Sequence, residues 1–116
     1  MIAAAGGCEI CGHSPARPHR GKPAELSRLC CHEIACGPHR QKSLDKPFAL
    51  LVLCWWCNGY RVTNKQWWSE ARQLAVLRAV RPNDYDLSAY NALVGYGPNR
   101  ITQEDVDRWV HARKDC

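Results

Sequence analysis

The spacing of apolar residues changes about halfway along the chain, and this change predicts two kinds of secondary structure. Residues 26–35 (LSRLCCHEIA) hold apolar residues between turn signals, and residues 48–54 (FALLVLC) form a short continuous apolar run. Runs of this length are typical of strands, and the second is expected to be a buried one. A short helix is expected to begin in WWCN (55–58) and to end before Thr63.

Helical spacing begins in the second half of the chain. Residues 64–82 predict a helix that Pro82 ends, because proline lacks an amide hydrogen and clashes with the preceding turn. One face of this helix is formed by Trp67, Ala71, Leu74 and Arg78, with Trp68, Ala75 and Leu77 beside them.

Two shorter helices are expected to follow. Residues 87–97 predict the first of them, with Gly95 or Gly97 as its terminator. The other lies in ITQEDVDRWVHA, where Thr102 is a good N-cap and Asp105 places an acid near the helix start. Together these patterns predict an α+β fold.

Chain length and cysteine content favour a small domain that needs cross-links. The chain has 116 residues and eight cysteines, which suits one domain stabilised by disulfides or by a metal ion. Its first residues (MIAAAGGCEI) lack the pattern of an export signal, and no segment approaches the roughly twenty apolar residues of a membrane helix. We therefore expect a cytoplasmic protein without a membrane partner, whose paired cysteines bind metal.

Positive charge is concentrated in the cysteine-rich half. Residues 1–66 carry nine Lys or Arg against four acids, whereas residues 67–116 carry seven of each sign. This asymmetry is expected if the first half meets phosphate, although ordinary solubilising charge would give the same pattern.

Four cysteines form two Cys-x-x-Cys knuckles, Cys8 with Cys11 and Cys54 with Cys57. Two such knuckles complete the tetrahedral set of thiolates that structural zinc prefers. Four thiolates close the coordination sphere, so this zinc would not activate water. Reduced free thiols and an iron–sulfur cluster remain alternatives. Metal binding would be part of folding.

The order of knuckle, strand, loop, strand and helix resembles a treble-clef zinc fold. The pieces CEIC, CHEI, ALLVLC and CWWCN, within residues 8–58, resemble the zinc-knuckle form of the HNH, or His-Me finger, endonuclease family. The resemblance implies a small treble-clef ββα core in residues 1–66. A helical extension in residues 67–116 would pack on that core within a single domain.

The resemblance also implies a catalytic site for cutting DNA. His32 falls where the family has its general base, which takes a proton from the water that attacks phosphorus. Asn58 falls where many members have a ligand for a catalytic divalent ion, which would be Mg²⁺ or Mn²⁺. These two residues together imply a metal-dependent DNA endonuclease.

Two positions depart from the family pattern. Cys31 replaces the usual Asp or His ligand, and a thiolate is a poor ligand for hard Mg²⁺. Ala49 replaces the asparagine that orients the base. Glu33 could supply an oxygen, but strand alternation turns it to the opposite face. These departures favour an alternative, a non-catalytic zinc-finger module that binds nucleic acid or a protein partner.

Basic and aromatic residues near the expected site suit contact with nucleic acid, with DNA as the expected partner. The basic residues that could contact phosphate are Arg17, Arg20, Lys22, Arg40, Lys42 and Arg61, with His19 and His39 in the same loops and Lys65 nearby. Five aromatic residues lie within fourteen positions, namely Trp55, Trp56, Tyr60, Trp67 and Trp68. Some of these rings must be core, and one or two exposed ones could stack on unpaired bases. Cys30 and Cys36 are expected to be small buried residues. The neutral helical extension could bind a partner or form a homodimer.

Overall fold

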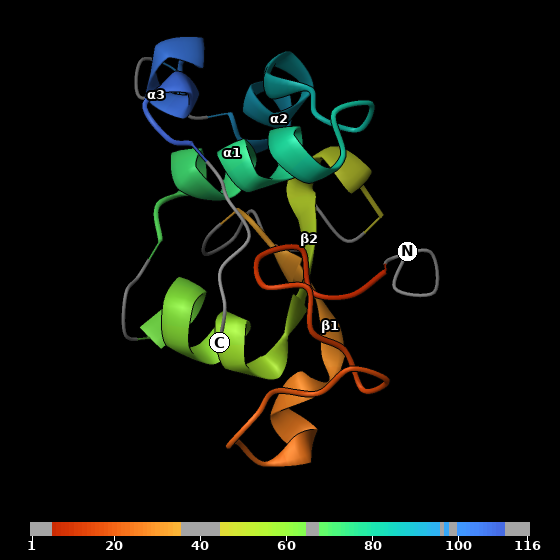
Figure 1. Ribbon diagram of the computed structural model, residues 1–116. Coiled ribbons are helices and arrows are strands. Elements are labelled where there is room, and N and C mark those ends of the chain that lie inside the picture. Colours follow the sequence, from red (N-terminus) through yellow and green to blue (C-terminus); the bar gives the residue numbers. More distant parts are fainter. Residues whose placement is uncertain (1–5, 36–44, 65–67, 96, 98–99, 111–116) are drawn as a thin grey trace. The chain divides into compact units, whose positions relative to one another are not determined.

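The computed structural model describes residues 6–35, 45–64, 68–95, 97 and 100–110. Their secondary structure confirms the α+β class, with a small antiparallel sheet preceding the α-helices (Figure 1). The predictions for Cys36, His39, Arg40, Lys42 and Lys65 lie outside the described residues, as does that for Trp67. Within the described part of the chain, no helix has the length and apolarity to cross a membrane.

The chain divides into two compact units. The metal-site unit takes the described residues of Met1–His32 and Val52–Ser69, and the helical unit takes those of Glu33–Leu51 and Glu70–His111. The segment that leads into β2 therefore belongs to the helical unit.

Two antiparallel strands, β1 (Leu29–Glu33) and β2 (Leu50–Cys54), form the sheet. All five residues of β2 are buried, which confirms the prediction from its continuous apolar run. The predicted strand start at residue 48 is replaced by a short 3-10 helix, η5 (Pro47–Ala49), because Pro47 fixes a helical φ at its first position.

A π-helix, η6 (Cys57–Asn64), follows the second knuckle. The helix was expected to end before Thr63, and it continues through that residue instead. The Thr63 hydroxyl donates a hydrogen bond of 2.7 Å to the Asn58 carbonyl five positions earlier. This bond spans the same number of residues as a π-helical turn, so the side chain supports the wider winding that extends the helix.

The helical unit contains α1 (Glu70–Val80), α2 (Leu87–Val94) and α3 (Gln103–Asp107), with α1 in contact with α3. The predicted apolar face is confirmed at Leu74, Ala75 and Leu77, which are buried. The predicted start at residue 64 was too early, since α1 begins at Glu70 and Trp68, although buried, precedes it.

Both predicted helix boundaries in the last third of the chain are confirmed. Gly95 ends α2 in the left-handed conformation, with φ 64°, which favours glycine. Thr102 begins α3 as its N-cap, and its hydroxyl accepts from the Asp105 amide while the Asp105 carboxylate accepts from the Thr102 amide. These bonds lower the pKa of Asp105, the backbone bond most.

Arg81 is expected to stabilise the helical unit. Its guanidinium donates to the carbonyls of Pro47, at 3.1 Å, and Leu50, and to the Asp84 carboxylate at 2.8 Å. Arg81→Gln should lower the free energy of unfolding by about 2–3 kcal/mol, since one hydrogen bond to a charged group contributes roughly 1.5–3 kcal/mol. Urea unfolding followed by tryptophan fluorescence measures this loss. Arg78→Gln, which removes a surface ion pair, is the control and should cost less than about 1 kcal/mol.

Candidate metal centre

The first knuckle is a tight turn closed by backbone hydrogen bonds. The Gly12 amide donates to the Cys8 carbonyl at 2.7 Å, and the Cys8 amide donates to the His13 carbonyl at 2.8 Å. Gly7 has φ 150°, and a Cβ there would lie 2.4 Å from the Gly12 carbonyl oxygen. A side chain at Gly7 would therefore force this turn open.

Glu9 joins the first knuckle to β2, which carries the second. Its amide donates to the Val52 carbonyl at 2.8 Å, and its carboxylate accepts from the Val52 amide at 2.6 Å. Cys54 ends β2 and Cys57 begins η6, with the Cys57 amide donating to the Cys54 sulfur at 3.3 Å. These bonds bring Cys11 close to Cys54, although the two are separated by 43 positions in the sequence.

The four knuckle cysteines form one buried cluster. The sulfurs of Cys8, Cys11, Cys54 and Cys57 all lie within 4.8 Å of one another, and that of Cys11 is 3.8 Å from that of Cys54. None of the four forms a disulfide, and each is at most 3% exposed. Four soft donors at this spacing fit a metal ion such as zinc, so the prediction that these residues can share one ion is confirmed.

Hydrogen bonds between the four thiols shift their pKa values in opposite directions. Cys54 and then Cys57 lower the pKa of Cys11 far below its ordinary range. Cys11 raises the pKa of Cys8, but bonds from Cys54 and Cys57 outweigh it and leave a pKa of about 7. Bonds to Cys11 raise the pKa of both Cys54 and Cys57. A cation would ionise all four thiols, as a coordinating metal does.

His19 and Arg61, which were predicted from the sequence to lie near phosphate, lie against the cysteine cluster. His19 is 5% exposed, and its Nε2 is 3.2 Å from the Cys54 sulfur. Burial is the largest cause that lowers the pKa of its imidazole, which favours the neutral form of the ring. Arg61 is 7% exposed, donates to the Cys57 sulfur at 3.9 Å and lies over the Trp56 ring. Burial therefore favours a structural role for Arg61 over the predicted contact with nucleic acid.

The predicted catalytic residues occupy β1 and the start of η6. Asn58 donates through Nδ2 to the Cys30 sulfur at 3.5 Å, and its buried Oδ1 has no hydrogen-bond partner. Cys30 and His32 share one face of β1 because strand residues two apart point the same way. His32 is therefore on the face of β1 that Asn58 contacts, whereas Cys31 is exposed on the other.

The remaining predicted phosphate contacts that the structure describes are in the loop before η2 (Ala24–Ser27). Arg20 is exposed, and Lys22 lies 4.9 Å from the centre of the Trp56 ring. Arg17 is exposed but donates to the Gly12 carbonyl at 2.7 Å.

Basic side chains of the metal-site unit lie over the faces of its aromatic rings. Trp56 stacks on Tyr60 with ring centres 4.6 Å apart, and Tyr60 is 41% exposed. Trp55 is 45% exposed, and the Arg28 guanidinium lies 5.4 Å from its centre. Arg28 was not singled out in the sequence, since it stands inside a predicted strand.

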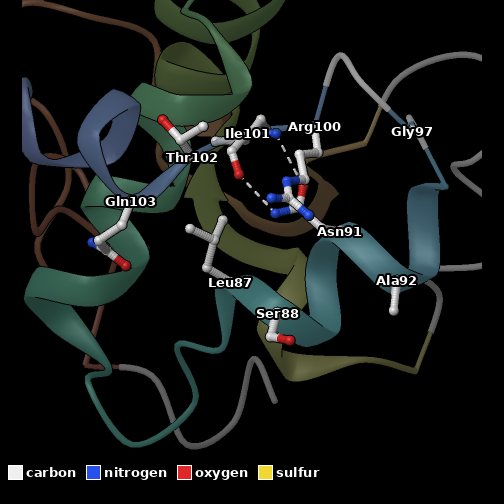
Figure 2. A pocket seen from close by; sticks show the side chains of 9 residues that line it. All are labelled: Leu87, Ser88, Asn91, Ala92, Gly97, Arg100, Ile101, Thr102 and Gln103. Carbon is white, nitrogen blue, oxygen red and sulfur yellow. Dashed lines mark hydrogen bonds between the residues drawn. The ribbon is translucent and has the colours of Figure 1, made fainter.

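A separate hollow of about 670 Å³ lies in the helical unit, beside α2 (Figure 2). The Asn91 amide in its wall bonds to both backbone groups of Ile101, at 2.7 and 3.1 Å. The other lining residues are Leu87, Ser88, Ala92, Gly97, Arg100, Thr102 and Gln103. These bonds occupy the Asn91 amide, whose role at this hollow is to hold two segments of the chain together.

No family model, curated protein or solved structure matches this chain. The function therefore has to be inferred from the residues of the site.

Proposed function

We propose that the chain is an HNH-like protein that binds nucleic acid, with DNA as the expected partner, and cuts it in a metal-dependent reaction. The buried cluster of four cysteines is the observation that carries this proposal. With Zn²⁺ bound as a closed Zn(Cys)4 centre, the first knuckle, the β1–β2 hairpin and η6 make a treble-clef arrangement. That arrangement is the framework on which the HNH resemblance places His32 and Asn58.

The surface chemistry around η6 supports nucleic acid as the partner. Exposed Trp55 and Tyr60 offer flat faces for bases, and the cations Lys22 and Arg28 lie over rings of the same segment. Base stacking on an aromatic ring contributes roughly 1–3 kcal/mol and tolerates any sequence. Arg20 adds an exposed charge for the phosphate backbone. The expected binding is therefore salt-dependent and weakly sequence-specific.

Removing two of these charges should reduce the salt dependence of DNA binding. For the double variant Arg20→Gln/Lys22→Gln, the slope of log K against log salt should fall by about two, because each lost phosphate contact removes roughly 0.9. Fluorescence anisotropy of a labelled duplex across a salt series measures the slope. Arg108→Gln removes an exposed charge at the C-cap of α3, is the matched control and should leave the slope unchanged. Equal slopes for all three proteins would exclude this loop from the interface.

Catalysis is proposed for His32 with Asn58. His32 would take the proton from the attacking water. The unpartnered Oδ1 of Asn58 is an oxygen donor of the kind that Mg²⁺ or Mn²⁺ prefers, and such an ion would neutralise charge developing on the phosphate. Among the described residues, clusters of three or more metal-binding side chains do not include His32. This arrangement fits an ion that takes its other ligands from water and substrate phosphate.

The alternative is a zinc-stabilised module that binds nucleic acid or a protein without cutting. The exposed Cys31 and the fully buried Ala49, which stand at two family motif positions, favour it. Incubation of supercoiled plasmid with the protein and Mg²⁺ or Mn²⁺ separates the two proposals. Nicked circles are the expected product, and intact plasmid together with DNA binding would establish the alternative.

A further inference from the structure

Two histidines adjoin the cysteine cluster without a known role. One nitrogen of His13, one nitrogen of His19 and the Cys11 sulfur all lie within 4.8 Å of one another. The two imidazoles lie close together, with ring centres 4.4 Å apart and ring planes tilted by 31°. In each ring Nδ1 is buried and has no hydrogen-bond partner. Two buried, unpartnered nitrogens beside a thiol call for a ligand that accepts their lone pairs.

The cysteine cluster fixes which nitrogen of His19 is available. The Cys54 sulfur, once it is a metal-bound thiolate, can only accept a hydrogen bond from His19 Nε2, which lies 3.2 Å away. That bond keeps the proton on Nε2, so the lone pair of this buried ring is on Nδ1, which has no hydrogen-bond partner. A ligating histidine commonly donates its second N–H in this way.

Charge in the cluster also favours another cation. Four thiolates and one Zn²⁺ together have a net charge of minus two. Because the four sulfurs are buried, this charge is unfavourable unless a nearby cation compensates it. The Arg61 guanidinium, 3.9 Å from the Cys57 sulfur, offsets one of these charges. Imidazole is a neutral ligand for zinc, so a second dication held by His13 and His19 would more than offset the remaining negative charge.

We propose that Cys11, His13 and His19 hold a second zinc ion, with the Cys11 thiolate bridging the two ions. Two imidazoles and one thiolate are a ligand set that zinc accepts. Three protein ligands leave a fourth position for water or an exogenous ligand, so this ion differs from the closed four-cysteine centre. The site shares Cys11 with the proposed zinc centre but does not depend on the nuclease proposal.

The stoichiometry of zinc tests this inference. Titration of the reduced, metal-free full chain with zinc, followed by calorimetry and by elemental analysis after desalting, should give two ions per chain. His13→Ala should retain one. The matched control is Cys31→Ala, an exposed side chain of the same unit outside the cluster, and it should retain two. Nitrogen NMR of the wild-type chain gives a readout that needs no variant, since the ring signals of His13 and His19 should shift with the second equivalent.

Each other outcome has a definite meaning. One ion in the wild-type chain, or two in His13→Ala with unmoved ring signals, would overturn the second site and leave the four-cysteine centre intact. Wild-type chain that binds no zinc would overturn both sites. If His13→Ala does not fold, the ring signals of the wild-type chain decide the question alone.

Discussion

Replacing Cys54 with serine is expected to abolish zinc binding at the four-cysteine centre and to unfold the metal-site unit. Cys54 is completely buried, and its sulfur is the one that Cys11, His19 and the Cys57 amide approach. Structural zinc contributes an apparent 10–16 kcal/mol in zinc-finger peptides, on the order of the whole stability of a domain, about 5–15 kcal/mol. The variant should therefore lose the circular-dichroism signal of the folded unit, as should wild-type chain treated with a strong chelator.

The matched control for this experiment is Cys31→Ser. Cys31 is exposed on β1, away from the cluster, so its replacement should leave zinc content and unfolding temperature unchanged. A folded, zinc-loaded Cys54→Ser protein would show that the cluster does not bind metal as proposed. Wild-type chain that keeps its fold in chelator would show that the apolar core alone suffices.

The two cysteine pairs of the cluster could be predicted because each pair depends only on residues that are close in the sequence. Each Cys-x-x-Cys pair is a short turn whose two sulfurs point the same way, so the spacing alone brings Cys8 near Cys11 and Cys54 near Cys57. The continuous apolar run of β2 likewise fixed its burial. The helix boundaries at Thr102 and Gly95 could be predicted because capping depends on one or two residues at the end of a helix.

The surroundings of the cluster could not be predicted, because they depend on long-range packing. His19 is 35 positions from Cys54, in a loop whose Pro, Gly and basic residues indicated a solvated segment. Its burial follows from the fold of that loop, where the His19 amide donates to the buried Ser27 hydroxyl at 2.9 Å. For Arg61, which was predicted to contact phosphate, the reason is local instead: the π-helical winding of η6 directs its side chain to the sulfur of Cys57, four positions earlier.

The metal centre and the proposed DNA surface share one segment of chain. Cys57 begins η6, Trp56 precedes it and Tyr60 follows one turn later. Arg61 connects the two by donating to the Cys57 sulfur while it lies over Trp56. Loss of the metal should therefore disturb the stacked rings as well as the knuckles, so DNA binding should require zinc even if zinc never touches DNA.

His32→Ala is expected to reduce plasmid nicking by roughly 10²–10⁴-fold, the usual contribution of a general base. His32 lies on the face of β1 that Asn58 contacts through Cys30, where a water activated by the imidazole would meet an ion held by the Asn58 oxygen. Initial rates of conversion of supercoiled to nicked plasmid, at saturating Mg²⁺ or Mn²⁺, measure the effect. DNA affinity should change little, because the proposed base acts on water rather than on the phosphate backbone.

Two further variants separate a catalytic role for His32 from a structural one. Glu33→Gln changes the next residue of β1, on the opposite face, and should nick at the wild-type rate. Asn58→Ala should nick slowly but recover in part at higher metal concentration, since it loses a ligand rather than the base. Wild-type nicking by His32→Ala with normal zinc content would remove His32 from the reaction. If Glu33→Gln also nicks slowly, the loss in His32→Ala would be explained by a change in the geometry of β1. Both substitutions alter that strand, but only His32→Ala removes an imidazole.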